Sequence, residues 1–306
     1  MKATRDSFGE ELAVLGEKNP EIVVLDADLS KSTKSNGFAK KFPNRFFEMG
    51  IAEANMIGTA AGLALSGKTS FACSFGCFLT GRYDQIRMSV SYNRANVKLI
   101  VTHSGVAIGE DGHSQMGLED VALLRSLPEF EIFQPADDQE TRAIIRYVVK
   151  NNGPCYIRLT RQKVPDIYKT PFEFVPGKWS ELHKGKGIAL IATGGLVGAC
   201  VEANEKTGKK LTVVNAASLK PIDEKLIEQL ANSHEWIVTA EDHYTTGGLG
   251  SAVAEVLASI GSKAKLYRIG VETFGESGSP EDVIHHFQLD SEGVLARLQK
   301  NVGLKI

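Results

Sequence analysis

The chain has 306 residues, of which 42% are hydrophobic and 24% charged, and its formal net charge at pH 7 is −2. These values are typical of a globular protein with room for two domains, and the small net charge excludes a general attraction to nucleic acid or to an anionic membrane. The sequence holds no apolar run of about 18 residues, so it predicts no membrane span. The N-terminal residues are polar and lack the apolar centre of a signal peptide, and the four cysteines are scattered, so we expect a cytoplasmic protein.

In the first half of the chain, apolar runs typical of buried strands alternate with helical patterns. Strands are expected at 22–25, 45–49, 70–75, 97–102, 130–133 and 155–159. Helices are expected at about 53–65, 80–91, 118–124 and 138–150. Strands that are apolar along their whole length and are separated by helices indicate a parallel sheet with both faces covered.

The pattern lapses between 165 and 187, where prolines, a glycine and charged residues indicate a linker. A second alternating unit follows, with strands at 188–192, 211–214, 236–239 and 266–269, and with helices at about 196–207, 224–231, 249–260 and 280–287. The fold class is therefore α/β, with two parallel or mostly parallel α/β domains at 1–164 and 188–306 joined by the linker 165–187. Glycine-rich turns at 193–198 and 246–250 lack the spacing of a nucleotide-binding motif, so we expect tight turns there.

The segment Gly50-Ile51-Ala52-Glu53-Ala54-Asn55-Met56 places a carboxylate at the start of an apolar, small-residue helix. A carboxylate there is poorly solvated, which favours its protonated form, and a protonated carboxyl can donate to a heterocycle. A glutamate that simply complements the positive end of the helix dipole would explain the same segment. Gly58 and Gly62, on the same helix, would let another element approach closely.

Polar and aromatic residues follow the strands at the points where the strands should end. They are Asp28 and Ser32, Glu53, Phe75 and Phe78, His103 with the loop 109–115, and Arg161. Taken singly, each has a structural explanation, such as a histidine that bonds its own loop or a phenylalanine in the core. In open α/β sheets, however, ligands bind outside the carboxyl ends of the strands, so the clustering favours a site.

Several motifs resemble the C-terminal half of transketolase, and the similarity runs over essentially the whole chain. They are Ala3-Thr4-Arg5, Asp28 with Ser32-Thr33, Gly50 to Met56, Asp84-Gln85-Ile86-Arg87-Met88, His103 with Gly109-Glu110-Asp111-Gly112, Ser114-Gln115-Met116, and Ile157-Arg158 with Arg161. The resemblance implies a pyrimidine-binding domain of the thiamine diphosphate enzymes followed by a transketolase C-terminal domain, which carries no catalytic groups in that family.

The resemblance also implies an activity, the transfer of a two-carbon ketol unit from a ketose phosphate to an aldose phosphate through thiamine diphosphate. It assigns catalytic roles to Glu53 and His103. It assigns cofactor binding to Asp28, Leu29, Glu53, Phe75, Phe78 and Gln115. It assigns substrate binding to Arg5, Ser32, His103, Asp111, His113 and Arg161. Two positions depart from the common pattern, because many bacterial transketolases have histidine where Gln115 stands and proline is usual where His113 stands.

Full-length transketolases also carry a Gly-Asp-Gly…Asn motif that binds the metal and the cofactor diphosphate, and no Gly-Asp-Gly occurs in this sequence. We therefore expect no metal ligands in this chain and a partner, the N-terminal transketolase subunit, that supplies the ligands for Mg²⁺ or Ca²⁺. Sugar phosphates are the expected substrates. A homodimeric contact within a heterotetramer, through the helix that carries Gly58 and Gly62, is a further expectation.

Three other functions fit parts of the pattern. The first two use the same cofactor: a 1-deoxyxylulose-5-phosphate synthase-like enzyme, which is normally one long chain, and the beta subunit of a 2-oxoacid dehydrogenase, whose sequence around its glutamate differs. The third is a non-catalytic or regulatory partner that has kept the fold. The joint presence of Glu53, His103, Asp111 and Arg161 argues against the third.

Overall fold

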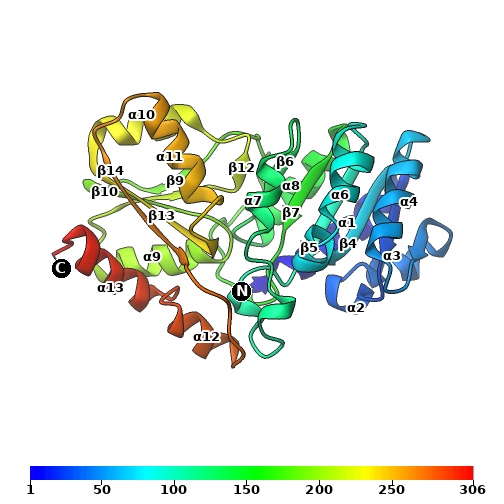
Figure 1. Cartoon of the computed structure of the whole chain (residues 1–306), viewed down its shortest axis with the longest axis horizontal. Coiled ribbons are helices and arrows are strands. Elements are labelled where there is room, and N and C mark those ends of the chain that lie inside the picture. Colours follow the sequence, from blue (N-terminus) through cyan, green and yellow to red (C-terminus); the bar gives the residue numbers. More distant parts are fainter. Residues whose placement is uncertain (306) are drawn as a thin grey trace.

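The computed structural model describes residues 1–305, and Figure 1 shows two lobes, each built on its own β-sheet with helices on both faces. The elements of the first lobe are β1 (Lys2–Ala3), α1 (Thr4–Lys18), β2 (Ile22–Asp26), α2 (Ser30–Thr33), α3 (Asn36–Lys41), η1 (Pro43–Arg45), β3 (Phe46–Glu48), α4 (Glu53–Leu65), β4 (Thr69–Phe75), α5 (Gly76–Thr80), α6 (Tyr83–Gln85), η2 (Ile86–Ser91), β5 (Val97–Thr102), η3 (Val106–Ile108), η4 (His113–Gln115), α7 (Asp120–Arg125), β6 (Glu131–Phe133), α8 (Asp138–Lys150), β7 (Cys155–Arg158) and β8 (Lys163–Val164).

The main sheet of the first domain has the strand order β12-β6-β7-β5-β4-β2-β3. All its pairs are parallel except β12 with β6, so the expected mostly parallel sheet is confirmed. The chain runs from β2 to β3 on one side and then returns to β4 on the other side of β2. The carboxyl ends of β2 and β4 therefore flank a topological switch point, where α/β proteins commonly bind ligands.

Apolar side chains fill both faces of this sheet. On one face, Phe8 and Leu12 of α1, Phe38 of α3 and Ile144 of α8 pack in one cluster with the side chains of the strands. On the other face, Met56, Ile57, Ala60 and Ala61 of α4 pack with Ile86 and Val90 of η2 and Val121 and Leu124 of α7. Burial on both faces explains why these strands are apolar along their whole length.

The second domain contains a five-stranded sheet in the order β14-β13-β10-β11-β9. Its elements, with β12, are β9 (Ser180–His183), β10 (Gly187–Ala192), α9 (Leu196–Lys206), β11 (Thr212–Asn215), β12 (Ser218–Lys220), α10 (Glu224–Ser233), β13 (His234–Tyr244), α11 (Leu249–Ser259), β14 (Lys265–Val271), α12 (Pro280–His286) and α13 (Ser291–Val302). In Figure 1, α10 and α11 lie on one side of this sheet, and α9, α12 and α13 lie on the other.

Three details differ from the sequence predictions. The segment 165–187 is not wholly a linker, because β9 lies within it and pairs antiparallel with β11. The strand β12 follows the second domain's β11 but pairs with β6 of the first sheet. Both strands are short edge strands, too brief and polar to give a strand pattern. The predicted helix at 80–91 is wrong in part, because Gly81 caps the end of α5 and 86–91 form a π-helical turn.

The expectation that Gly58 and Gly62 let another element approach is not met within this chain, because a Cβ at either position would have no neighbour within 4 Å in the part of the chain that the structure describes. All four cysteines are free, and Cys73, Cys155 and Cys200 are buried. None of the helices in residues 1–305 is both long and apolar enough to cross a membrane.

Candidate active site

The candidate site lies along the carboxyl ends of five neighbouring strands of the first sheet, β7-β5-β4-β2-β3. Each of these strands is followed within a few residues by at least one side chain that the sequence singled out. In strand order these side chains are Arg161, His103, Phe75 and Phe78, Asp28 and Ser32, and Glu53. The parallel sheet therefore brings residues from distant parts of the chain to one edge.

His103, Arg5 and Ser32 meet at this edge. Arg5, in the first turn of α1, donates from one guanidinium nitrogen to His103 Nε2 at 3.1 Å and to the backbone carbonyl of Ser32 at 3.0 Å. The Arg5 Nε atom is buried and has no hydrogen-bond partner in residues 1–305. Burial lowers the pKa of the Arg5 guanidinium, Asp6 opposes this, and the positive charge of Arg161 adds to it. Arg5 thus keeps unused hydrogen-bonding capacity.

The hydrogen bonds of His103 determine its tautomer. Because a guanidinium only donates, the Nε2 atom that faces Arg5 must be the unprotonated acceptor. The Nδ1 atom then carries the proton and donates to the Thr102 hydroxyl at 2.7 Å. Burial, together with the charges of Arg5, Arg161 and Lys34, lowers the pKa of His103 from 6.5 to about 3. His103 is therefore neutral near pH 7.

This lowered pKa predicts a titration result. The ring signals of His103 should not shift between pH 8 and pH 5, whereas those of the exposed His285, whose pKa Asp290 raises, should shift. The unfolded chain binds a proton at His103 below about 6.5, so the stability due to the neutral ring is full above that pH and is lost as the pH falls towards 3. NMR of selectively labelled histidine measures the first effect, and a titration of His103 near pH 6.5 would contradict the account.

Aromatic rings line the middle of the site. The Phe75 ring lies against the His103 ring at 3.9 Å between centroids, and it stacks with Phe78 at 5.5 Å and an interplanar angle of 12°. Phe75 is buried and Phe78 is half-buried. His103 has a positive φ of 59°, an uncommon conformation for a residue with a side chain. A row of aromatic rings and a histidine with a strained backbone at one sheet edge indicate a functional site rather than ordinary core packing.

Glu53 is the first residue of α4, as predicted, and is 7% exposed. Its carboxylate makes no hydrogen bond or ion pair with any other group in residues 1–305. Neither carboxylate oxygen is among the fully buried, unpartnered side-chain atoms of residues 1–305, so the carboxyl group is accessible from outside the chain. A carboxyl that is accessible and has no partner within residues 1–305 suits the binding of a ligand or of another chain.

The loop after β2 is organised by Asp26, which sequence reasoning missed. Its buried carboxylate accepts from the Leu29 N–H at 2.7 Å and from the hydroxyls of Thr33 and Ser35 at 2.7 and 2.8 Å. Burial raises the pKa of Asp26 to about 6. Asp28, two residues later, is exposed with a φ of 62°, and its N–H donates to Glu48. The signal for Asp26 was its place as the last residue of an apolar strand.

Cations gather at the other end of the site. One guanidinium nitrogen of Arg161 donates to the backbone carbonyl of Ile108 at 2.6 Å and lies 3.4 Å from the Glu110 carboxylate. Lys34, also missed from the sequence, directly follows α2, the short helix that carries Ser32, and its positive charge helps to lower the pKa of His103. With Arg5, these residues form a cationic cluster, Arg5, Lys34 and Arg161, that suits an anion. The proximity of Lys34 to Ser32-Thr33 in the sequence was its only signal.

Besides His103, three predicted residues lie in the substrate loop, which is defined here as residues 103–118. Asp111 is exposed. His113 contacts the second domain, where its Nδ1 accepts from the Gly275 N–H at 3.1 Å. Gln115 is half-buried in η4, which packs against α5, the helix that carries Phe78.

The two glycine-rich turns of the second domain are tight turns, as predicted. A Cβ at Gly194 would lie 2.3 Å from the Gln134 amide, and a Cβ at Gly248 would meet the Glu241 carboxylate. Glu241 already accepts from the first N–H groups of α11, those of Leu249 and Gly250. Among residues 1–305, no group of three or more His, Cys, Asp or Glu side chains could hold a metal ion.

Comparison with known proteins identifies the fold. Residues 1–166 match the family model "Transketolase, pyrimidine binding domain", and residues 177–294 match "Transketolase, C-terminal domain". The chain belongs to the transketolase family. This transketolase-family chain is 43% identical over 308 residues to a Methanocaldococcus jannaschii protein named as a transketolase C-terminal section, covering 98% of this chain and 96% of that protein.

Two further relatives cover the chain almost completely. One of the subunits of an apulose-4-phosphate transketolase from Actinobacillus succinogenes is 35% identical, over 90% of each chain. A solved structure described as a split gene transketolase in an inactive beta4 tetramer is 43% identical, covers 100% of both chains and superposes with a TM-score of 0.90. The expected fold class, a transketolase pyrimidine domain together with a transketolase C-terminal domain, is thus confirmed.

Proposed function

We propose that this chain is the C-terminal subunit of a two-chain transketolase, which moves a two-carbon ketol unit from a ketose phosphate to an aldose phosphate with thiamine diphosphate. One observation carries the proposal: the ends of five adjacent strands bring to one sheet edge a carboxyl with no partner in residues 1–305, a pair of stacked aromatic rings, a histidine and the cationic cluster. The family membership supports it.

The residues present fit an aminopyrimidine ring. Phe75 and Phe78 offer aromatic surface, and the Glu53 carboxyl has no protein partner in residues 1–305, so it can bond a ring nitrogen. Bound thiamine diphosphate would supply the electron sink for carbon–carbon cleavage. The task of Glu53 is to hold a proton against that ring nitrogen, and the task of the phenylalanines is to orient the ring and exclude water.

The cationic cluster fits the phosphate of a sugar phosphate. A guanidinium offers a planar fork to phosphate oxygens, and the buried Nε of Arg5 is unused in residues 1–305. A phosphate that engages Arg5 would compete with the hydrogen bond from Arg5 to His103. His103 Nε2 would then be left for a sugar oxygen. Remote phosphate binding of this kind can orient the reacting carbonyl.

We further propose that the metal and the diphosphate are held by a partner chain, the N-terminal transketolase subunit. The sequence lacks the family's Gly-Asp-Gly motif, and a neighbouring structure is described as an inactive tetramer of one kind of chain from a split gene. Exposed apolar side chains on α4 and its neighbours fit an assembly surface: Ile51, two residues before Glu53, is 83% exposed, Leu65 at the far end of α4 is 63% exposed, and Tyr92, which follows η2, is 78% exposed. Exposed apolar surface of this kind commonly marks an interface.

Cofactor binding should depend on the partner. The purified chain alone should bind thiamine diphosphate with Mg²⁺ weakly or not at all, and a mixture with the chain that carries Gly-Asp-Gly…Asn should bind it and convert a ketose phosphate plus an aldose phosphate. Isothermal titration and product analysis measure both. A pyruvate-consuming mixture would favour a deoxyxylulose-phosphate-type synthase, and an active N-terminal subunit without this chain would favour a regulatory role; either result would overturn the proposal.

A further inference from the structure

We infer that the second domain fixes the conformation of the substrate loop, and that Phe274 is a positioning residue for sugar recognition through His113. This inference deepens the proposed function and rests on it for the identity of the substrate. The second domain would then have a role in the site, although the residues at the strand ends of the first sheet all come from the first domain. The contacts that carry it lie along the whole length of the substrate loop.

The apolar side chains of the substrate loop belong to the core of the second domain. Four of them are at most 2% exposed: Val106, Ile108, Met116 and Leu118. They pack in one cluster with second-domain residues, among them Leu190, Ala192, Ala240, Ile269, Val271 and Val283. The loop therefore depends on the second domain for its burial, although it continues directly from β5 of the first domain.

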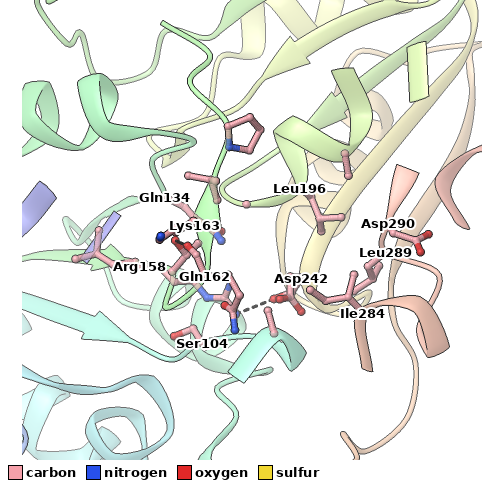
Figure 2. Close-up of a pocket in the computed structure, with 17 residues that line it drawn as sticks. Ser104, Gln134, Arg158, Gln162, Lys163, Leu196, Asp242, Ile284, Leu289 and Asp290 are labelled. Atoms are coloured by element: carbon pink, nitrogen blue, oxygen red, sulfur yellow. Dashed lines mark hydrogen bonds between the residues drawn. The ribbon is translucent and has the colours of Figure 1, made fainter. Parts of the chain in front are cut away.

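Polar contacts fix both ends of the loop to the end of β13. The Val106 N–H donates to the Asp242 carboxylate at 2.8 Å, and the Tyr244 N–H donates to the Leu118 carbonyl at 2.9 Å. Buried Arg158 donates to the carbonyls of both Gly117 and Asp242 at 2.8 Å. Figure 2 shows the hydrogen bond from Arg158 to Asp242 beside a cavity of about 180 Å³ that residues of both domains line.

The tip of the loop lies under the segment 272–280, which leads from β14 into α12. A Cβ at Gly109 would lie 2.8 Å from the Pro280 ring, and a Cβ at Gly112 would lie 2.3 Å from the Ser277 hydroxyl. Both glycines also have positive φ, 80° and 76°. The positive φ therefore requires glycine at both positions, and at Gly109 the close approach of Pro280 requires it as well.

His113 is oriented by the same segment. Its Nδ1 accepts from the Gly275 N–H at 3.1 Å, so the neutral ring carries its proton on Nε2. The Phe274 ring contacts the His113 ring edge to face, with 4.8 Å between the ring centroids and an interplanar angle of 69°. Phe274 is 72% exposed, so it borders the open side of the loop and does not belong to the core. His113 thereby offers an oriented N–H donor.

An oriented donor beside the exposed carboxylate of Asp111 suits the hydroxyls of a sugar. The two side chains are two residues apart in the loop, and one donates while the other accepts, so together they can distinguish hydroxyl arrangements. If Phe274 and Gly275 hold the His113 ring, loss of the Phe274 ring should weaken sugar binding more than it slows the chemistry.

Hydrogen exchange in this chain alone tests the positional part. In Phe274→Ala, the amides of 109–117 should exchange several-fold faster than in the wild type, while those of β5 and α8 keep their rates. Ile260→Ala, at an apolar position 39% exposed at the end of α11, should leave the substrate loop unchanged. Equal exchange of 109–117 in Phe274→Ala and the wild type would overturn the inference, whatever the fate of the proposed function.

Steady-state kinetics of the two-chain complex test the substrate part. Phe274→Ala should raise KM for a ketose phosphate about three- to tenfold, as expected for one aromatic contact, with kcat nearly unchanged, and Phe274→Tyr should restore KM. In a His113→Leu background, Phe274→Ala should add little, because the two act together. Independent, multiplying effects of the two substitutions would overturn the positioning role. An inactive wild-type complex would instead refute the proposed function.

Discussion

Replacement of Glu53 by glutamine should lower turnover of the two-chain complex by about 10²- to 10⁴-fold, the usual contribution of a positioned proton donor or acceptor. Glutamine keeps the size of the side chain and can still bond a ring nitrogen, but it cannot exchange a proton with it. Because the Glu53 carboxylate makes no hydrogen bond within residues 1–305, the substitution should change the free energy of unfolding by no more than about 0.5 kcal/mol.

The matched control is Glu21→Gln. Glu21 is exposed, pairs with Lys68 and lies just before β2, at the opposite end of the sheet from the candidate site. Its substitution should leave both turnover and stability unchanged, because exposed ion pairs contribute little. Measurement of kcat and thermal unfolding on the same preparations separates a catalytic loss from a folding defect. Turnover of Glu53→Gln within a factor of about two of the wild type would remove Glu53 from the mechanism.

Replacement of Arg161 by alanine should raise KM for phosphorylated ketoses by about 10- to 100-fold, because hydrogen bonds to a charged group contribute about 1.5–3 kcal/mol. The KM for the corresponding unphosphorylated sugars should stay the same, and kcat should change little. Arg161→Lys keeps the charge but loses the planar fork, so it should give an intermediate KM. Initial rates with paired phosphorylated and unphosphorylated substrates measure these differences.

Arg94→Ala is the control for Arg161. Arg94 also pairs with a glutamate, Glu129, but it lies before β5 at the far end of the sheet. Its loss should leave both KM values unchanged. Equal losses with phosphorylated and unphosphorylated sugars in Arg161→Ala would show that Arg161 supports the loop, through Glu110 and the Ile108 carbonyl, and does not bind phosphate.

The candidate site could be assembled from the sequence because it follows one rule of parallel sheets. Apolar strands flanked by helices indicated the direction of the strands, and the residues after them then had to share an edge. That reasoning placed Glu53 at the start of α4 and His103 directly after β5, where the structure has them. It needed only local patterns, each confined to a short segment of the chain.

Contacts between distant segments could not be predicted in this way. The hydrogen bond from Gly275 to His113 joins residues 162 positions apart, and no local sequence pattern predicts it. The pairing of β12 with β6 likewise joins the second half of the chain to the first sheet. The tautomer of His103 depends on Arg5, which approaches it from another element. Such features depend on contacts between segments that are far apart in the sequence and meet only when the chain has folded.

The most direct test of the account is a structure of the two-chain complex with thiamine diphosphate and Mg²⁺. The account predicts a Glu53 carboxylate oxygen about 2.6–3.2 Å from a nitrogen of the aminopyrimidine ring, with Phe75 or Phe78 stacked on that ring. A pyrimidine ring bound elsewhere, with the Glu53 carboxylate bonded to the partner chain, would contradict it.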